Sequence, residues 1–287
     1  MQYRTILVPL SGGDIGRSPL EAAFAVARQF EAHVEVLHVR PDPRNMIPYV
    51  GEGMSGALIE EVMGAAEREA GERADSAHHT FEEIVTREGV QIRAEPDGPG
   101  LSAHWREESG REDESVARFG RTADLVVVSR PVKEAEVPTS TVFEAALFES
   151  GQPLLVAPPQ PVSIIGQRVM IAWNGSPEAA RAVTHGIPFL RGAEHVHILS
   201  VVSWGEGPTS VAGVARRLGW HGIRATVETI DEPVGTVGET VVAEAGRFGA
   251  DLIVMGAYTQ SRLRQMILGG VTRHLLSTAS VPLLMAH

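Results

Sequence analysis

Cysteine is absent from the 287 residues of this chain, and basic side chains are fewer than acidic ones. Without thiols the protein forms no disulfide, no zinc–thiolate site and no cysteine nucleophile. The 25 basic and 36 acidic side chains give a net charge of -11, which argues against general binding to nucleic acid or to membrane surfaces. No apolar run is long enough to span a membrane, and the chain enters a strand directly after Met1 without a signal peptide. We therefore expect a cytoplasmic protein.

Familiar catalytic signatures are also missing. The sequence contains neither a Gly-x-Ser-x-Gly nucleophile elbow nor a Gly-x4-Gly-Lys-Ser/Thr phosphate loop. Eleven histidines are present, but no carboxylate–histidine spacing typical of a metal site accompanies them. We expect no catalytic residue and no metal held by the protein itself.

The chain does contain an internal duplication. Its length of 287 residues and its hydrophobic content of 43% are sufficient for two domains. The matching apolar segments are 5–12 with 168–175, 34–39 with 196–202, 123–129 with 250–256, and 153–157 with 282–286. Helical stretches separate these segments. Continuous apolar strands that alternate with helices predict parallel sheets covered on both faces. The predicted fold class is α/β, with two doubly wound, Rossmann-like domains.

Three prolines within residues 158–161 predict the boundary between a first domain over 1–160 and a second over 166–287. The first domain carries extra material. Residues 57–87 have helical periodicity and charge pairing, which predict one long or broken helix. Residues 96–110 are rich in Gly, Pro and Ser and predict a loop.

The C-terminal segment holds the most informative pattern. A buried strand ends at Gly256, a loop containing Arg262 follows, and Gly269 and Gly270 open the next helix. A glycine at a strand end lets a ligand approach the backbone, and a helix start offers free N–H groups to an anion. Ligands of doubly wound sheets bind beyond the carboxyl ends of the strands, where Asn174 follows the first strand of the second half. This arrangement predicts a cradle for a nucleotide phosphate.

The spacing of these glycines resembles the Gly-x2-Gly-x9-Gly-Ser/Thr pattern of the universal stress proteins, and the duplication resembles a tandem member of that family. Gly256 and Gly269 match the pattern, whereas Thr259 and Gly270 replace its second glycine and its Ser/Thr. The resemblance implies two adenine nucleotide alpha hydrolase-like domains that pair through their last strands as an intramolecular pseudo-dimer. It is compatible with a monomer or with a homodimer of the whole chain.

The resemblance also implies an adenine nucleotide in the second domain, either ATP or AMP, with or without Mg²⁺. Asn174 takes the place of an aspartate that contacts the adenosine, and Thr272 is the candidate to supply the hydroxyl that Gly270 lacks. The residues expected at the nucleotide are Ala172, Trp173, Asn174, Val201, Met255, Gly256, Thr259, Arg262, Gly269, Gly270, Val271 and Thr272.

The first half departs from the pattern much further. Residues 129–132 read Ser-Arg-Pro-Val where the second half has a strand-ending Met-Gly, and residues 133–140 contain no glycine. We interpret the first half as a structural copy without nucleotide binding. The long helix predicted over 57–87 is hypothesised to cover its empty crevice.

The expected function is that of a cytoplasmic stress-response protein that senses an adenine nucleotide and regulates an unidentified protein partner. One alternative is a nucleotide-free interaction scaffold, in which Thr259 blocks the phosphate path and residues 42–115 carry the partner surface. The other is an ATP-cleaving enzyme of the pyrophosphatase type. Its support is the segment from Ser11 to Asp14, which resembles the Ser-Gly-Gly-x-Asp-Ser loop of those enzymes.

Overall fold

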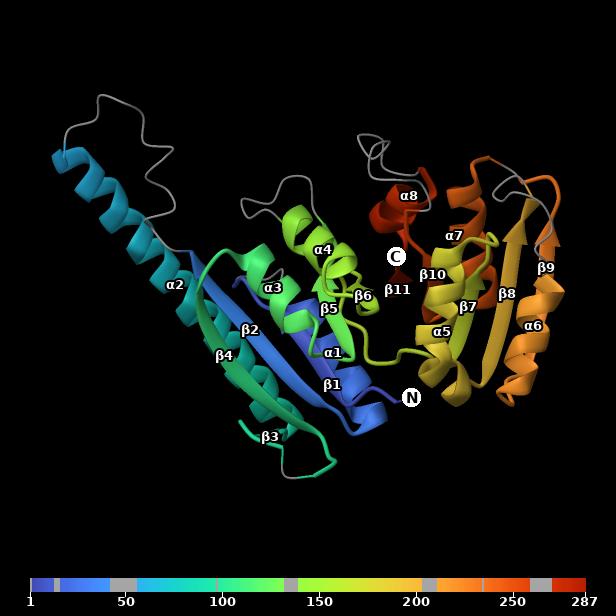
Figure 1. Ribbon diagram of the computed structural model, residues 1–287, viewed down its shortest axis with the longest axis horizontal. Helices are drawn as coiled ribbons and strands as arrows, with labels where there is room; N and C mark the ends of the chain where they lie inside the picture. The colour runs from blue at the N-terminus through green and yellow to red at the C-terminus, as the bar shows by residue number, and fades with distance from the viewer. Residues whose placement is uncertain are drawn as a thin grey trace.

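The computed structural model describes residues 2–12, 16–41, 56–96, 98–131, 139–202, 211–233, 235–258 and 270–287. Strands and helices alternate along both halves of the chain (Figure 1). The elements of the first half are β1 (Thr5–Pro9), α1 (Arg17–Phe30), β2 (His33–Pro41), α2 (Gly56–Glu88), β3 (Gln91–Ile92), β4 (Ser102–Gly110), α3 (Glu112–Gly120), β5 (Leu125–Ser129), α4 (Thr139–Phe148) and β6 (Leu154–Ala157). Those of the second half are β7 (Arg168–Ala172), α5 (Pro177–Gly192), β8 (His195–Val201), α6 (Val211–Trp220), β9 (Ala225–Ile230), α7 (Val237–Phe248), β10 (Leu252–Gly256), α8 (Gly270–Thr278) and β11 (Leu283–Ala286).

The described strands join into one sheet with the order β3-β4-β2-β1-β5-β6-β11-β10-β7-β8-β9. Within each half the neighbouring strands are parallel, and the first strand lies between the second and the one before last. The halves meet where β6 and β11 pair antiparallel, with Leu155 opposite Leu284. The predicted doubly wound fold and the pairing of the two domains through their last strands are therefore confirmed.

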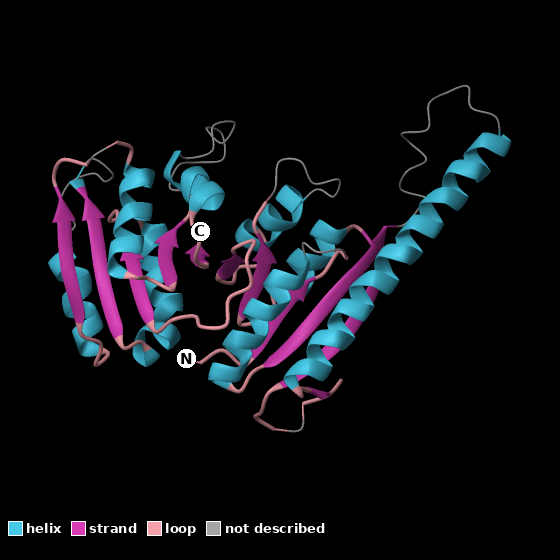
Figure 2. Ribbon diagram, turned by 180° about the vertical axis from the view of Figure 1, so that it is seen from behind, coloured by secondary structure: helices cyan, strands magenta, loops and turns pink. Residues whose placement is uncertain are grey.

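Burial on both faces of the sheet explains the continuous apolar strands. Every residue of β10 is buried, and so are all but the first residue of β1 and β7. Helices α1, α2, α5 and α6 pack an apolar layer against one face. Helices α3, α4, α7 and α8 pack a second layer against the other, so the molecule has three layers (Figure 2).

Local signals set the starts of two helices in the second domain. Ser176 accepts a hydrogen bond from the Ala179 N–H at 3.1 Å and caps α5, with Pro177 at the first helical position. Thr236 and Glu239 form a reciprocal capping box at the start of α7.

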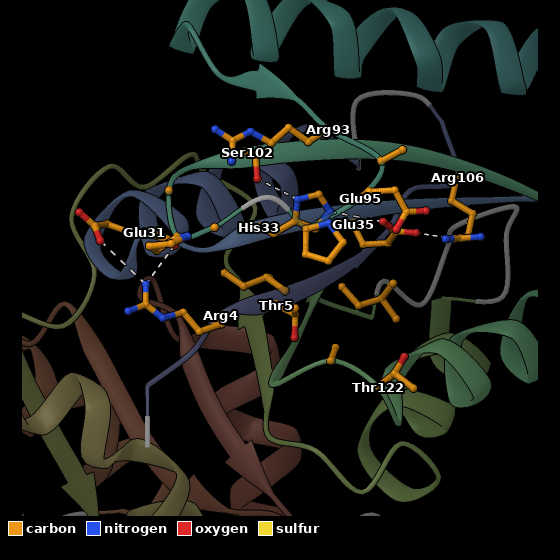
Figure 3. Close-up of a pocket in the computed structure, with 18 of the residues that line it drawn as sticks. Arg4, Thr5, Glu31, His33, Glu35, Arg93, Glu95, Ser102, Arg106 and Thr122 are labelled. Atoms are coloured by element: carbon orange, nitrogen blue, oxygen red, sulfur yellow. Dashed lines mark hydrogen bonds and ion pairs between the residues drawn. The ribbon is translucent and has the colours of Figure 1, made fainter.

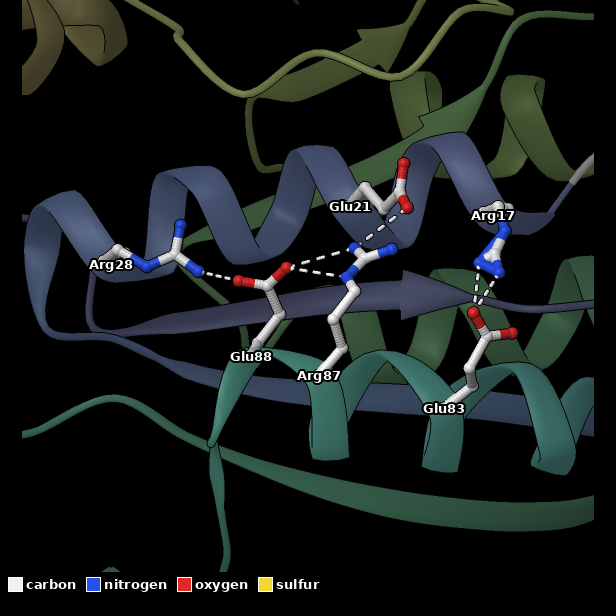
Figure 4. A network of polar contacts seen from close by, with 6 residues as sticks. All are labelled: Arg17, Glu21, Arg28, Glu83, Arg87 and Glu88. Carbon is white, nitrogen blue, oxygen red and sulfur yellow. Dashed lines mark hydrogen bonds and ion pairs between the residues drawn. The ribbon is translucent and has the colours of Figure 1, made fainter.

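The extra material of the first domain forms α2, a single helix of 33 residues that confirms the helix predicted over 57–87. Its N-terminal part projects beyond the end of the sheet (Figure 1), whereas its C-terminal part lies along α1. Ion pairs join the two helices there (Figure 4). The pairs are Arg17–Glu83, Arg28–Glu88 and Glu21–Arg87, the last at 2.9 Å.

The prediction of a loop over residues 96–110 is wrong for residues 102–110. Residues Ser102–Gly110 form β4, which pairs with β2 along its whole length. Trp105 of this strand stacks on His38 of β2, with ring centroids 5.7 Å apart. The strand is polar because cross-strand ion pairs such as Arg106–Glu35 stabilise it, and such pairing leaves no apolar period in the sequence.

Aromatic side chains also link the two domains. Phe189 of α5 is fully buried, and its ring centroid lies 5.4 Å from that of Tyr3 and 5.2 Å from that of Phe30. The Tyr3 hydroxyl donates a hydrogen bond to the His185 carbonyl at 2.6 Å. Burial raises the pKa of Tyr3, so the phenol stays neutral.

Candidate functional site in the second domain

The turn after β7 is built by the side chain of Asn174. Its Oδ1 accepts a hydrogen bond from the Ser176 N–H at 3.1 Å, and Ser176 in turn caps α5. Gly175 between them has φ of 78°, a conformation that favours glycine. Asn174 is half-buried at the carboxyl end of β7, where the sequence analysis expects it.

Three apolar residues of the predicted site lie at neighbouring strand ends. Ala172 of β7 pairs with Met255 of β10 on one side and with Leu199 of β8 on the other. Val201 ends β8, and all of these residues are buried. Trp173 is 8% exposed and packs in the apolar layer. The structure thus brings Ala172, Trp173, Asn174, Val201 and Met255 to one edge of the sheet.

Gly256 is required by the packing of the protein itself. A Cβ at this position would lie 2.4 Å from the Ala179 nitrogen and 2.7 Å from the Glu178 carbonyl carbon. The end of β10 therefore touches the first turn of α5, a contact that any side chain would break. This close approach is sufficient to explain the glycine.

The start of α8 lies beyond the carboxyl end of β10 (Figure 1). Gly270 is exposed, and a Cβ there would have no described atom within 4 Å. Val271 is half-buried, and Thr272 lies with Leu275 and Leu276 on the buried side of the helix. That side faces the protein, which does not favour donation of the Thr272 hydroxyl to a ligand at the exposed helix start. The other predicted residues, Thr259, Arg262 and Gly269, lie outside the described residues.

Tyr258 is a residue of this region that sequence reasoning missed. It follows β10 with φ of 55°, and its ring packs on Phe148 of the first domain with centroids 5.4 Å apart. Burial, with a smaller contribution from Glu144, raises its pKa to about 12. A neutral phenol just after β10 therefore contacts the first domain, and no local pattern in the sequence marks it.

Comparison with known proteins shows the family to which this chain belongs. The model of the universal stress protein family matches residues 2–134 and again 166–287. The chain belongs to the universal stress protein family. It contains the family domain twice, so the predicted tandem arrangement is confirmed.

Relatives of similar length support the same architecture. Universal stress protein Slr1230 from Synechocystis is 23% identical over 98% of this chain and 99% of its own. A universal stress protein from Archaeoglobus fulgidus has the same fold, with a TM-score of 0.70, 18% identity and coverage of 100% of this chain and 99% of its own. A putative universal stress protein from Pseudomonas aeruginosa gives a TM-score of 0.57 at 14% identity, covering 98% and 92% of the two chains.

In the first domain of this universal stress protein, α2 and α3 contact the corresponding turn after β1. Ser11 takes the place of Asn174, and its hydroxyl donates a hydrogen bond to Glu112 at 2.6 Å. Burial raises the pKa of Glu112. Beside it, a Cβ on Gly12 would lie 2.7 Å from the Arg73 carbonyl oxygen, so α2 packs against the end of β1. Glu112 and the long helix therefore contact the turn of the first domain that corresponds to the Asn174 turn of the second.

The described residues contain neither a membrane-spanning helix nor a cluster of metal-binding side chains. No helix in the described part of this universal stress protein is long and apolar enough to cross a membrane. Within the same ranges, no three or more His, Asp or Glu side chains gather in a way that could hold a metal ion. For the pyrophosphatase alternative, Ser11 is engaged with Glu112, whereas Gly13 and Asp14 lie outside the described residues.

Proposed function

We propose that the second domain binds an adenine nucleotide, ATP or AMP, and that the bound state regulates a protein partner in the cytoplasmic stress response. The proposal rests on one observation: the Asn174 turn, the end of β10 and the start of α8 lie at the same edge of the sheet. This is the position at which doubly wound sheets bind nucleotides. On this proposal the protein acts through binding rather than through turnover of the nucleotide.

Two features of α8 favour a phosphate group at its start. The helix carries no acidic residue in its first turn, so the positive end of its dipole is not neutralised locally. Gly270 is exposed, and the space beside it is open among the described residues. The first N–H groups of the helix are therefore accessible to an anion.

A side chain at Gly270 would meet no described atom within 4 Å, which permits a sharp test. Gly270→Asp puts a carboxylate where the phosphate is proposed to bind, and an acidic residue in a first turn stabilises a helix. Folding stability should be unchanged or higher, while electrostatic repulsion weakens nucleotide binding. Gly270→Asn has nearly the same shape without the charge and serves as the matched control.

The measurement is calorimetric titration of ATP and AMP into ligand-free wild type and both variants. We expect micromolar binding by wild type, a loss of at least tenfold in affinity in Gly270→Asp, and a much smaller loss in Gly270→Asn. If folded wild type binds neither nucleotide, the scaffold alternative is favoured. Equal affinity of all three proteins would place any nucleotide elsewhere.

A further inference from the structure

A pocket of about 670 Å³ opens in the first domain at the edge of the sheet opposite to the nucleotide crevice (Figure 3). Its floor is formed by the starts of β1, β2 and β4, which contribute Thr5, His33 and Ser102. The end of α3 forms one wall with Phe119, and residues of the connection between β3 and β4 form the rim. The volume is in the range of sites that hold a drug-sized molecule.

Comparison with the second domain explains why the pocket of the first domain is open. Thr5 and Arg168 are equivalent, because their carbonyls accept bonds from the Asp124 and Asp251 N–H groups, each at 2.9 Å. In the second domain, the Arg168 guanidinium lies over the Phe248 ring at 4.7 Å and donates to the Phe248 carbonyl at 2.6 Å. The short Thr5 side chain cannot fill the same space.

The polar groups at the floor of the pocket are held in place by one another. Arg106 donates through Nε to the Glu35 carboxylate, and His104 Nδ1 lies 3.1 Å from the same group. The Arg106 guanidinium carbon is 5.1 Å from the centroid of the Phe119 ring. The terminal amino groups of Arg106 donate no hydrogen bond to any described residue, so they are available to a hydrogen-bond acceptor on a ligand.

The lining has balanced charge and large apolar surfaces. Three arginines and three glutamates line the pocket together with Leu7, Phe119 and Ala123. The charged residues are Arg4, Arg93, Arg106, Glu31, Glu35 and Glu95. Because Glu35 neutralises Arg106, this guanidinium favours an uncharged acceptor over a full anion. We propose that the pocket binds an uncharged, flat, carbonyl-bearing small molecule, with its ring system beside Phe119 and its carbonyl on Arg106.

The test uses Nile red, an uncharged planar dye with a ring carbonyl that fluoresces strongly in apolar sites. Thr5→Arg supplies the long side chain that fills this space in the second domain. Thr5→Ser keeps the hydroxyl that bonds Asp124 at 3.1 Å and adds no volume, so it is the matched control. Ala123→Phe is a second filling variant, in the segment that joins α3 to β5. Thermal unfolding of each variant establishes that it is folded.

We expect wild type and Thr5→Ser to bind the dye with affinities within twofold of each other, and both filling variants to bind at least tenfold more weakly. Unchanged dye binding in the folded Thr5→Arg and Ala123→Phe variants overturns the proposal. Displacement of the dye by AMP would assign it to the other crevice and has the same consequence. Tighter binding of the sulfonate dye 1-anilinonaphthalene-8-sulfonate, lost in Thr5→Arg, would overturn the assignment of an uncharged ligand.

Discussion

Replacement of Glu35 by glutamine probes the ion-pair cluster that stabilises the polar strand β4. Glu35 lies on β2, and its carboxylate contacts Arg106, His104 at 3.1 Å and His33 at 3.5 Å. Burial alone would raise its pKa, but the hydrogen bonds from these three side chains lower it from 4.5 to about 2. The ionised form of Glu35 therefore stabilises the folded protein.

The size and the pH dependence of this stabilisation follow from linkage. A pKa lowered this far corresponds to at most about 3.4 kcal/mol, and solvent screening at a partly exposed carboxylate reduces the expected value to about 1–2 kcal/mol. Because the folded-state pKa is the lower one, the contribution is fully present above the unfolded pKa of 4.5. It is lost as the pH falls from 4.5 towards 2.

Urea unfolding of wild type and Glu35→Gln at pH 7 and pH 3 measures this contribution. We expect the variant to be less stable at pH 7, and the difference to shrink by more than half at pH 3. Glu95→Gln, an exposed carboxylate on the rim of the same pocket, should match wild type at both pH values. The linkage argument fails if Glu35→Gln equals wild type at pH 7 or if its deficit is the same at pH 3.

Two further substitutions test the packing. Phe189→Ala should cost about 3–5 kcal/mol in urea unfolding, because the buried ring contacts aromatic side chains of the first domain; a cost below about 1 kcal/mol would contradict this role. Gly256→Ala should cost about 1–3 kcal/mol, because its Cβ would lie 2.4 Å from the Ala179 nitrogen. Gly270→Ala, whose Cβ would have no described atom within 4 Å, is the control and should be neutral or stabilising in thermal unfolding. Equal effects at the two glycines would refute the close-contact explanation.

The repeated strands and the long helix could be predicted because each is visible in a local pattern. A strand buried on both faces needs a continuous apolar run, and β7 and β10 have one. The polar strand β4 could not be predicted in this way. Its partners, such as Glu35 for Arg106, lie about 70 residues away in the chain, and periodicity carries no information about cross-strand pairs.

The candidate site was predictable in position but not in the roles of its residues. Topology alone places Asn174 and Gly256 at adjacent strand ends. The sequence could not reveal that Gly256 is needed by the backbone of α5, because this contact joins segments that meet only in the folded chain. For the same reason it missed Tyr258, which is significant through its contact with Phe148 of the other domain.

By itself, the sequence determined the α/β class, the duplication, the long helix and the edge of the second domain at which a nucleotide is expected. These properties depend on hydrophobic period and chain order, which each segment carries within itself. Only the tertiary structure decided that Glu112 engages Ser11 in the first crevice and that Thr5 leaves open a space that Arg168 fills in the duplicate. Those outcomes depend on which distant side chains meet across the sheet and on their size, and the folded chain alone establishes both.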